Sequence, residues 1–61
     1  MNKELKRQIA NFILDNGENF QLTNATAGKF RPYIYGEDGN FLIGGKEVYL
    51  FITEFVKISK L

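Results

Sequence analysis

The sequence of 61 residues contains no cysteine and no histidine. The absence of cysteine excludes a disulfide framework and thiolate metal ligands. The absence of histidine excludes imidazole ligands, catalytic triads built on histidine and a histidine pH switch. We therefore expect no metal, no cofactor and no catalytic residues, so the chain is predicted not to be an enzyme.

Long hydrophobic runs are also lacking. The longest uninterrupted apolar run is Val48–Ile52, whereas a membrane span needs roughly 20 residues and the core of a signal peptide needs about 7 to 15. Charged residues already occur within residues 1–5, where a signal peptide would become apolar. These features predict a cytoplasmic protein with no membrane partner.

The chain has little excess charge of either sign, because it contains eight Lys and Arg residues and seven Asp and Glu residues. This balance does not by itself indicate a polyanionic partner. The hydrophobic share of 44% and the charged share of 25% are ordinary for a folded globular chain. At this length we expect a single domain over residues 1–61. The abundance of Asn, Lys, Ile and Phe is typical of AT-rich coding and suggests a phage, prophage or plasmid source.

An amphipathic helix is predicted over residues 2–16. Its apolar residues recur at helical spacing on one stripe, namely Leu5, Ile9, Phe12 and Ile13. Gly17 follows directly and is predicted to end the helix, since glycine readily adopts the left-handed conformation of a helix C-terminus.

The middle of the chain is predicted to form three short antiparallel strands. Residues 19–24 and 29–35 alternate apolar and polar side chains, and residues 25–28 are small enough to turn the chain between them. The Asp-Gly pair within residues 36–40 predicts a tight turn before a third strand at residues 41–43. The expected core side chains of this sheet are Phe20, Leu22, Phe30, Ile34, Phe41 and Ile43.

Pro32 interrupts the second predicted strand. Because proline has no N–H to donate to a β-ladder, we expect its nitrogen to face an open edge or a bulge.

Residues 46–60 admit two interpretations. Their β-branched and aromatic residues favour a strand by propensity. On a helical wheel, however, most apolar side chains fall on one half, namely Val48, Phe51, Ile52, Phe55, Val56 and Ile58. We predict a helix, which gives an α+β fold of helix, three-stranded antiparallel sheet and helix. The alternative is an N-terminal helix followed by a small SH3-like or Sm-like barrel.

The predicted order of elements resembles the double-stranded RNA-binding domain in architecture. Members of that family open their second helix with a Lys-rich phosphate clamp. The matching stretch here is Gly45–Val48, which contains one Lys and an opposing Glu. The same order resembles small phage-encoded inhibitors of host enzymes and host defence.

The most distinctive surface is the polar face of the second predicted strand, formed by Lys29, Arg31, Tyr33 and Tyr35. Cations alternating with rings are typical of single-stranded nucleic-acid binding, and further contacts would come from Lys3, Lys6 and Arg7. Surplus surface rings are equally typical of protein interfaces, for which Tyr49 is a further candidate. A merely solvated face is the third interpretation.

Two functional hypotheses follow. The leading one is a non-enzymatic binding protein that inhibits or regulates a host macromolecule through a protein–protein interface and forms homo-oligomers. The alternative is a nucleic-acid-binding module that uses the basic and aromatic strand face.

Overall fold

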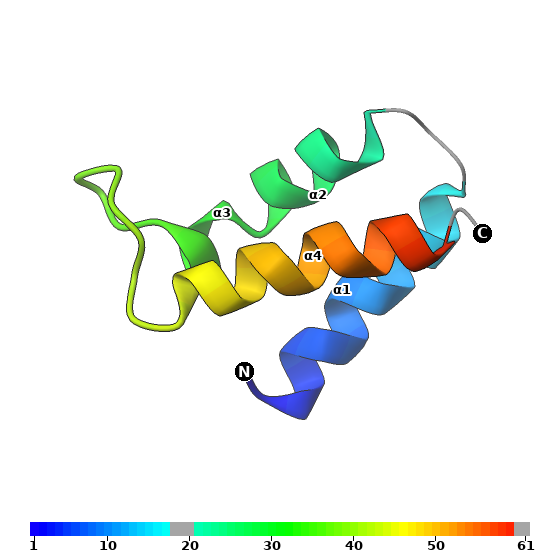
Figure 1. The fold of residues 1–61 in the computed structure, drawn as a ribbon, viewed down its shortest axis with the longest axis horizontal. Coiled ribbons are helices and arrows are strands. Elements are labelled where there is room, and N and C mark those ends of the chain that lie inside the picture. The colour runs from blue at the N-terminus through cyan, green and yellow to red at the C-terminus, as the bar shows by residue number, and fades with distance from the viewer. Residues whose placement is uncertain (18–20, 60–61) are drawn as a thin grey trace.

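The computed structural model describes residues 1–17 and 21–59. Within these residues the chain forms four helices and no strand, so the predicted α+β fold is wrong (Figure 1). In chain order the helices are α1 (Lys3–Asn16), α2 (Leu22–Lys29), α3 (Arg31–Ile34) and α4 (Gly45–Ser59). The only β pairing among the described residues is an isolated bridge between Tyr35 and Phe41.

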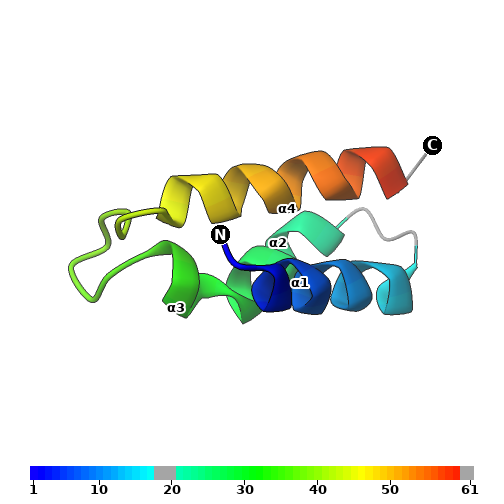
Figure 2. The same ribbon diagram turned by 90° about the horizontal axis from the view of Figure 1, so that it is seen from below.

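The helices are arranged in two layers. Helix α4 lies on one side, and α1, α2 and α3 lie on the other (Figure 2). Helix α4 contacts all three of the others, so the core forms along its inner face. The buried apolar residues are Ile9, Ile13, Leu22, Phe30, Ile34, Val48, Ile52 and Val56.

Helix α1 confirms the N-terminal prediction. The Asn2 side-chain oxygen accepts a hydrogen bond of 2.7 Å from the Leu5 N–H, which caps the first turn. At the other end Gly17 has φ 63° and ψ −154°, a conformation that is nearly restricted to glycine. Ile9 and Ile13 are the buried residues of the helix, as the apolar stripe predicted.

Helix α4 confirms the helical interpretation of the C-terminal segment. Its buried side chains Val48, Ile52 and Val56 recur every four residues. Helical periodicity therefore prevailed over the β propensity of the individual residues, because burial of one stripe contributes more than propensity does. The barrel alternative, which needed a strand here, is wrong.

Residues 21–35 differ most from the prediction, and the first two residues of the predicted strand at 19–24 lie outside the described residues. The segments expected to be strands and a turn instead form α2 and α3, which are joined at Phe30. Thr26 is fully buried in α2, and its hydroxyl donates a hydrogen bond of 2.7 Å to the Leu22 carbonyl one turn earlier. This bond satisfies the one buried polar side chain of the described core.

Pro32 lies in the first turn of α3 rather than at a sheet edge. The N–H groups of a first helical turn have no partner within the helix, so the proline loses no hydrogen bond there. The architecture expected for a double-stranded RNA-binding domain is therefore not present, since α2 and α3 replace two of its three strands.

The predicted turn at residues 36–40 is confirmed. The Gly36 N–H donates to the Asn40 carbonyl at 2.9 Å, and Gly39 has the expected positive φ of 84°. Pairing stops after one bridge, however, so the third predicted strand does not form. Phe41 is 50% exposed and Ile43 is fully exposed, which corrects their assignment to the core. The predicted core residue Phe20 lies outside the described residues.

None of the described helices combines the length and the apolar character that a membrane span requires.

Candidate interaction surface

Exposed apolar side chains gather where α3, the following loop and the start of α4 meet. We call this surface the loop patch and define it as Arg31, Tyr35, Phe41, Leu42, Ile43 and Tyr49. Leu42 is 41% exposed, in addition to the exposed Phe41 and Ile43. Consecutive exposed apolar residues of this kind mark interaction surfaces more often than single ones do.

The rings of the loop patch form a continuous stack. The Tyr35 and Phe41 rings are nearly parallel, with centroids 5.0 Å apart and an interplanar angle of 24°. Phe41 in turn meets Tyr49 of α4 edge-on at 6.4 Å. Aromatic pairs in these geometries stabilise by about 0.5 to 1.5 kcal/mol beyond the area they bury. The stack therefore fixes the loop against α4 while leaving Phe41 half exposed.

Arg31 extends the stack with a cation. Its guanidinium carbon lies 5.1 Å from the centroid of the Tyr35 ring, one helical turn further along the chain. Arg31 forms no ion pair with any of the described residues. The guanidinium therefore keeps N–H groups available for an outside carboxylate or carbonyl.

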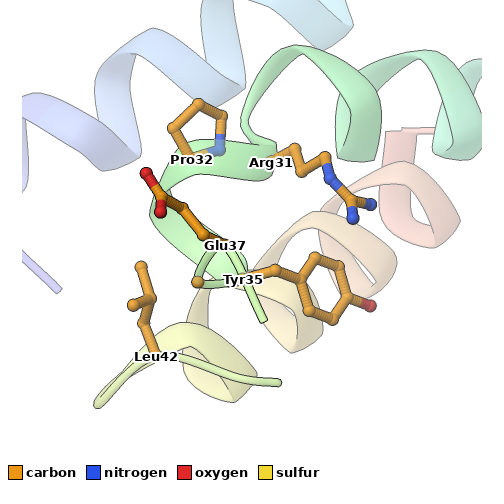
Figure 3. Close-up of a pocket in the computed structure, with 6 residues that line it drawn as sticks. Arg31, Pro32, Tyr35, Glu37 and Leu42 are labelled. Atoms are coloured by element: carbon orange, nitrogen blue, oxygen red, sulfur yellow. The ribbon is translucent and has the colours of Figure 1, made fainter. Parts of the chain in front are cut away.

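An open hollow of about 520 Å³ adjoins this stack. It is lined by Arg31, Pro32, Tyr35, Gly36, Glu37 and Leu42. Figure 3 shows the Arg31 guanidinium and the Glu37 carboxylate at opposite sides of it, with Pro32 and Leu42 nearer to Glu37. The hollow thus has an apolar lining and one charge of each sign.

The structure unites three of the predicted contact residues, Arg31, Tyr35 and Tyr49, in the loop patch. It places the other two elsewhere. Lys29 lies with its Nζ 5.2 Å from the centroid of the Phe12 ring on α1, and Tyr33 lines a separate hollow beside Leu5. The predicted face of alternating cations and rings therefore does not exist.

The basic residues of α1 are also separate from the loop patch. Lys3, Lys6 and Arg7 are all exposed on α1. Arg7 binds Glu4 of the preceding turn, and hydrogen bonds from Arg7 and Gln8 hold the pKa of the Glu4 carboxyl below its ordinary value. Part of the predicted basic surface is thus neutralised within its own helix.

Sequence reasoning missed Phe41 and Ile43 as patch residues because a third strand would have hidden both of them in the core. A signal was present, since three consecutive apolar residues follow a polar turn and precede two glycines. A strand with one buried face alternates polar and apolar residues. The unbroken run could instead have suggested an apolar loop.

The turn that presents the loop patch is held by Asp38. Its Oδ1 accepts a hydrogen bond of 3.0 Å from the Asn40 backbone N–H, and its Oδ2 accepts one of 3.2 Å from the Asn40 amide. Both hydrogen bonds lower the pKa of Asp38 below its ordinary value, and the bond from the backbone N–H has the larger effect. Local side-chain bonds of this type are typical of turns built on aspartate.

This lowered pKa predicts that the turn loosens in acid. A carboxyl whose pKa is lower in the folded state stabilises that state above its unfolded pKa, and the stabilisation is lost as the pH falls through the folded value. A titration followed by NMR should show Asp38 titrating below the ordinary aspartate pKa, together with a shift of the Asn40 amide. Asn40→Ala should leave part of the lowering, because the backbone N–H remains. Titration of Asp38 at or above the ordinary value would contradict this account.

Comparison of the chain with protein-family models, curated proteins and solved structures gave no match. Within residues 1–17 and 21–59, no three side chains of His, Cys, Asp or Glu gather as metal ligands would. The loop patch is the surface of the described residues that bears on function.

Proposed function

We propose that this protein is a non-catalytic binding module that inhibits or regulates a macromolecule by contacting a protein surface through the loop patch. The observation that carries the proposal is the side-by-side exposure of Phe41, Leu42 and Ile43 next to an aromatic stack. Tyr and Arg supply a large share of the energetically important contacts in protein interfaces. The loop patch combines both with aliphatic side chains.

The aliphatic part of the patch favours a protein partner over a nucleic acid. Nucleic-acid surfaces combine rings with a cationic track for the phosphates. In the loop patch the single cation Arg31 lies on the opposite side of the hollow from the Glu37 carboxylate, and Leu42 and Ile43 offer neither charge nor a stacking surface. Lys29 and Tyr33, which the nucleic-acid hypothesis required beside Arg31, border other hollows.

Substitution of Ile43 tests the proposal. Ile43 is fully exposed, so Ile43→Asn should leave the unfolding free energy within about 0.5 kcal/mol of the parent value. It should nevertheless reduce retention of a protein partner about tenfold or more, because a polar side chain replaces an apolar contact. The measurement is affinity capture from a bacterial lysate, with and without nuclease.

Ile58→Asn is the matched control. Ile58 is 62% exposed near the end of α4 and lies outside the loop patch. A captured protein that survives nuclease, persists with Ile58→Asn and disappears with Ile43→Asn would support the proposal. Equal capture by both variants, or capture that depends on nucleic acid, would refute it.

A further inference from the structure

The hollow beside the loop patch is flanked by two charges that form no ion pair with any of the described residues. Arg31 and Glu37 are both exposed and both line it. The ion pairs of the described residues are those of Met1 with Glu47 and of Glu4 with Arg7. An occupant with a carboxylate toward Arg31 and a cation toward Glu37 would therefore complement both charges.

Ile43 is an exposed aliphatic side chain close to the hollow in the sequence. It stands free in solvent, one residue beyond Leu42, which lines the hollow. The apolar part of the lining, Pro32, Tyr35 and Leu42, is of the kind that accepts an aliphatic side chain. The same loop thus carries a protruding apolar residue and an apolar recess next to each other.

We propose that the occupant of the hollow is a second copy of this chain, related to the first by a two-fold axis. Ile43 of each copy enters the hollow of the other, and Arg31 of each copy pairs with Glu37 of the other. A two-fold interface uses the same surface on both subunits, so the surface must be self-complementary in shape and charge. The loop patch together with Glu37 offers a charge of each sign and a protruding Ile43 beside an apolar hollow. This inference rests on the proposed function, since it assumes that the loop patch binds protein.

The area available predicts a weak and reversible dimer. The chain exposes 4519 Å², and a standard interface of about 800 Å² on each partner would take nearly a fifth of it. The loop patch has only six residues and supplies less than that. Self-association should therefore increase with concentration across the micromolar to millimolar range rather than be complete at all concentrations.

Charge reversal tests the two-fold pairing. In Arg31→Glu each contact would bring two carboxylates together, and in Glu37→Arg it would bring two cations together. Each variant alone should dimerise about tenfold or more weakly than the parent chain. An equimolar mixture of the two variants restores opposite charges at both contacts, and so does the doubly reversed chain. Both should dimerise about as well as the parent in sedimentation equilibrium.

The outcomes separate this inference from the proposed function. Rescue in the mixture, together with loss of dimer in Ile43→Asn, would support the two-fold pairing. A parent chain that stays monomeric, or one whose association ignores both charge reversals, would overturn it. If that monomer still captures another protein through Ile43, the proposed function survives without the dimer. If it captures none, both fail.

Discussion

Gly45→Ala should lower the free energy of unfolding by more than about 2 kcal/mol. A Cβ at this position would lie 2.0 Å from the carbonyl oxygen of Ile34 and 2.9 Å from its carbonyl carbon. Both atoms belong to the backbone, so they cannot move aside as the end of a flexible side chain could. A domain of this length has a total stability of about 3 to 9 kcal/mol, so a loss of about 2 kcal/mol removes roughly a quarter to two thirds of it.

The contact lies where the loop returns to the helices. The Leu42 N–H donates to the Ile34 carbonyl at 2.9 Å, and the Gly45 N–H donates to the Leu42 carbonyl at 2.8 Å. Separating α4 from α3 to fit a methyl group would therefore also disturb the base of the loop patch.

Gly28→Ala is the matched control for this prediction. Gly28 lies within α2, and a Cβ there would meet no atom within 4 Å. Alanine is preferred to glycine in a helix by about 1 kcal/mol, so this variant should be slightly more stable than the parent. Urea unfolding followed by circular dichroism gives both values. Changes of the same sign in the two variants would contradict the close approach of α3 and α4.

Ile52→Ala should lower the free energy of unfolding by about 2 to 5 kcal/mol. Ile52 is fully buried at the middle of α4, where α4 packs against the opposite layer. Removing its side chain loses both the buried apolar area and the contacts around the cavity that remains.

Leu50→Ala is the control, because Leu50 is 50% exposed in the same helix. It should change the unfolding free energy by no more than about 0.5 kcal/mol. In a strand, residues 50 and 52 would share one face, so both substitutions would be costly. Equal losses in urea unfolding would therefore contradict the helix.

The two long helices could be predicted from the sequence because each has room for four turns. In α4 the buried Val48, Ile52 and Val56 are each four residues apart. This spacing also places side chains on one face of a strand. In a strand, Glu54 would lie on the same face as these apolar side chains and would interrupt it, which argued against a strand. The end of α1 at Gly17 could also be predicted, because glycine readily adopts the positive φ that is found there.

The short helices could not be predicted in the same way. Leu22 and Thr26 are four residues apart, and so are Phe30 and Ile34. A spacing of four places two side chains on one face in a helix and in a strand alike. Helix α2 has eight residues and α3 has four, so neither contains enough turns to separate the two periods. Packing against α4 decides their structure, and packing is not visible in a local pattern.

The same geometry explains which site residues were predicted correctly. Arg31 and Tyr35 share a face in either structure because they are four residues apart. Tyr33 would join them in a strand, but in a helix it is rotated by about 200° from each. It therefore lies on another face of α3, where it lines a hollow with Leu5 and Gln8 of α1.

A concentration series of amide NMR spectra tests the central claim that the loop patch is the binding surface and meets a second copy. If the loop patch pairs with a second copy, signals should move with concentration at Arg31, Tyr35, Glu37 and residues 41–43, with little change at Leu14 and Ile58. Leu14 and Ile58 are each 62% exposed apolar residues outside the patch. Spectra that do not change with concentration, or changes centred on Leu14 and Ile58, would contradict it.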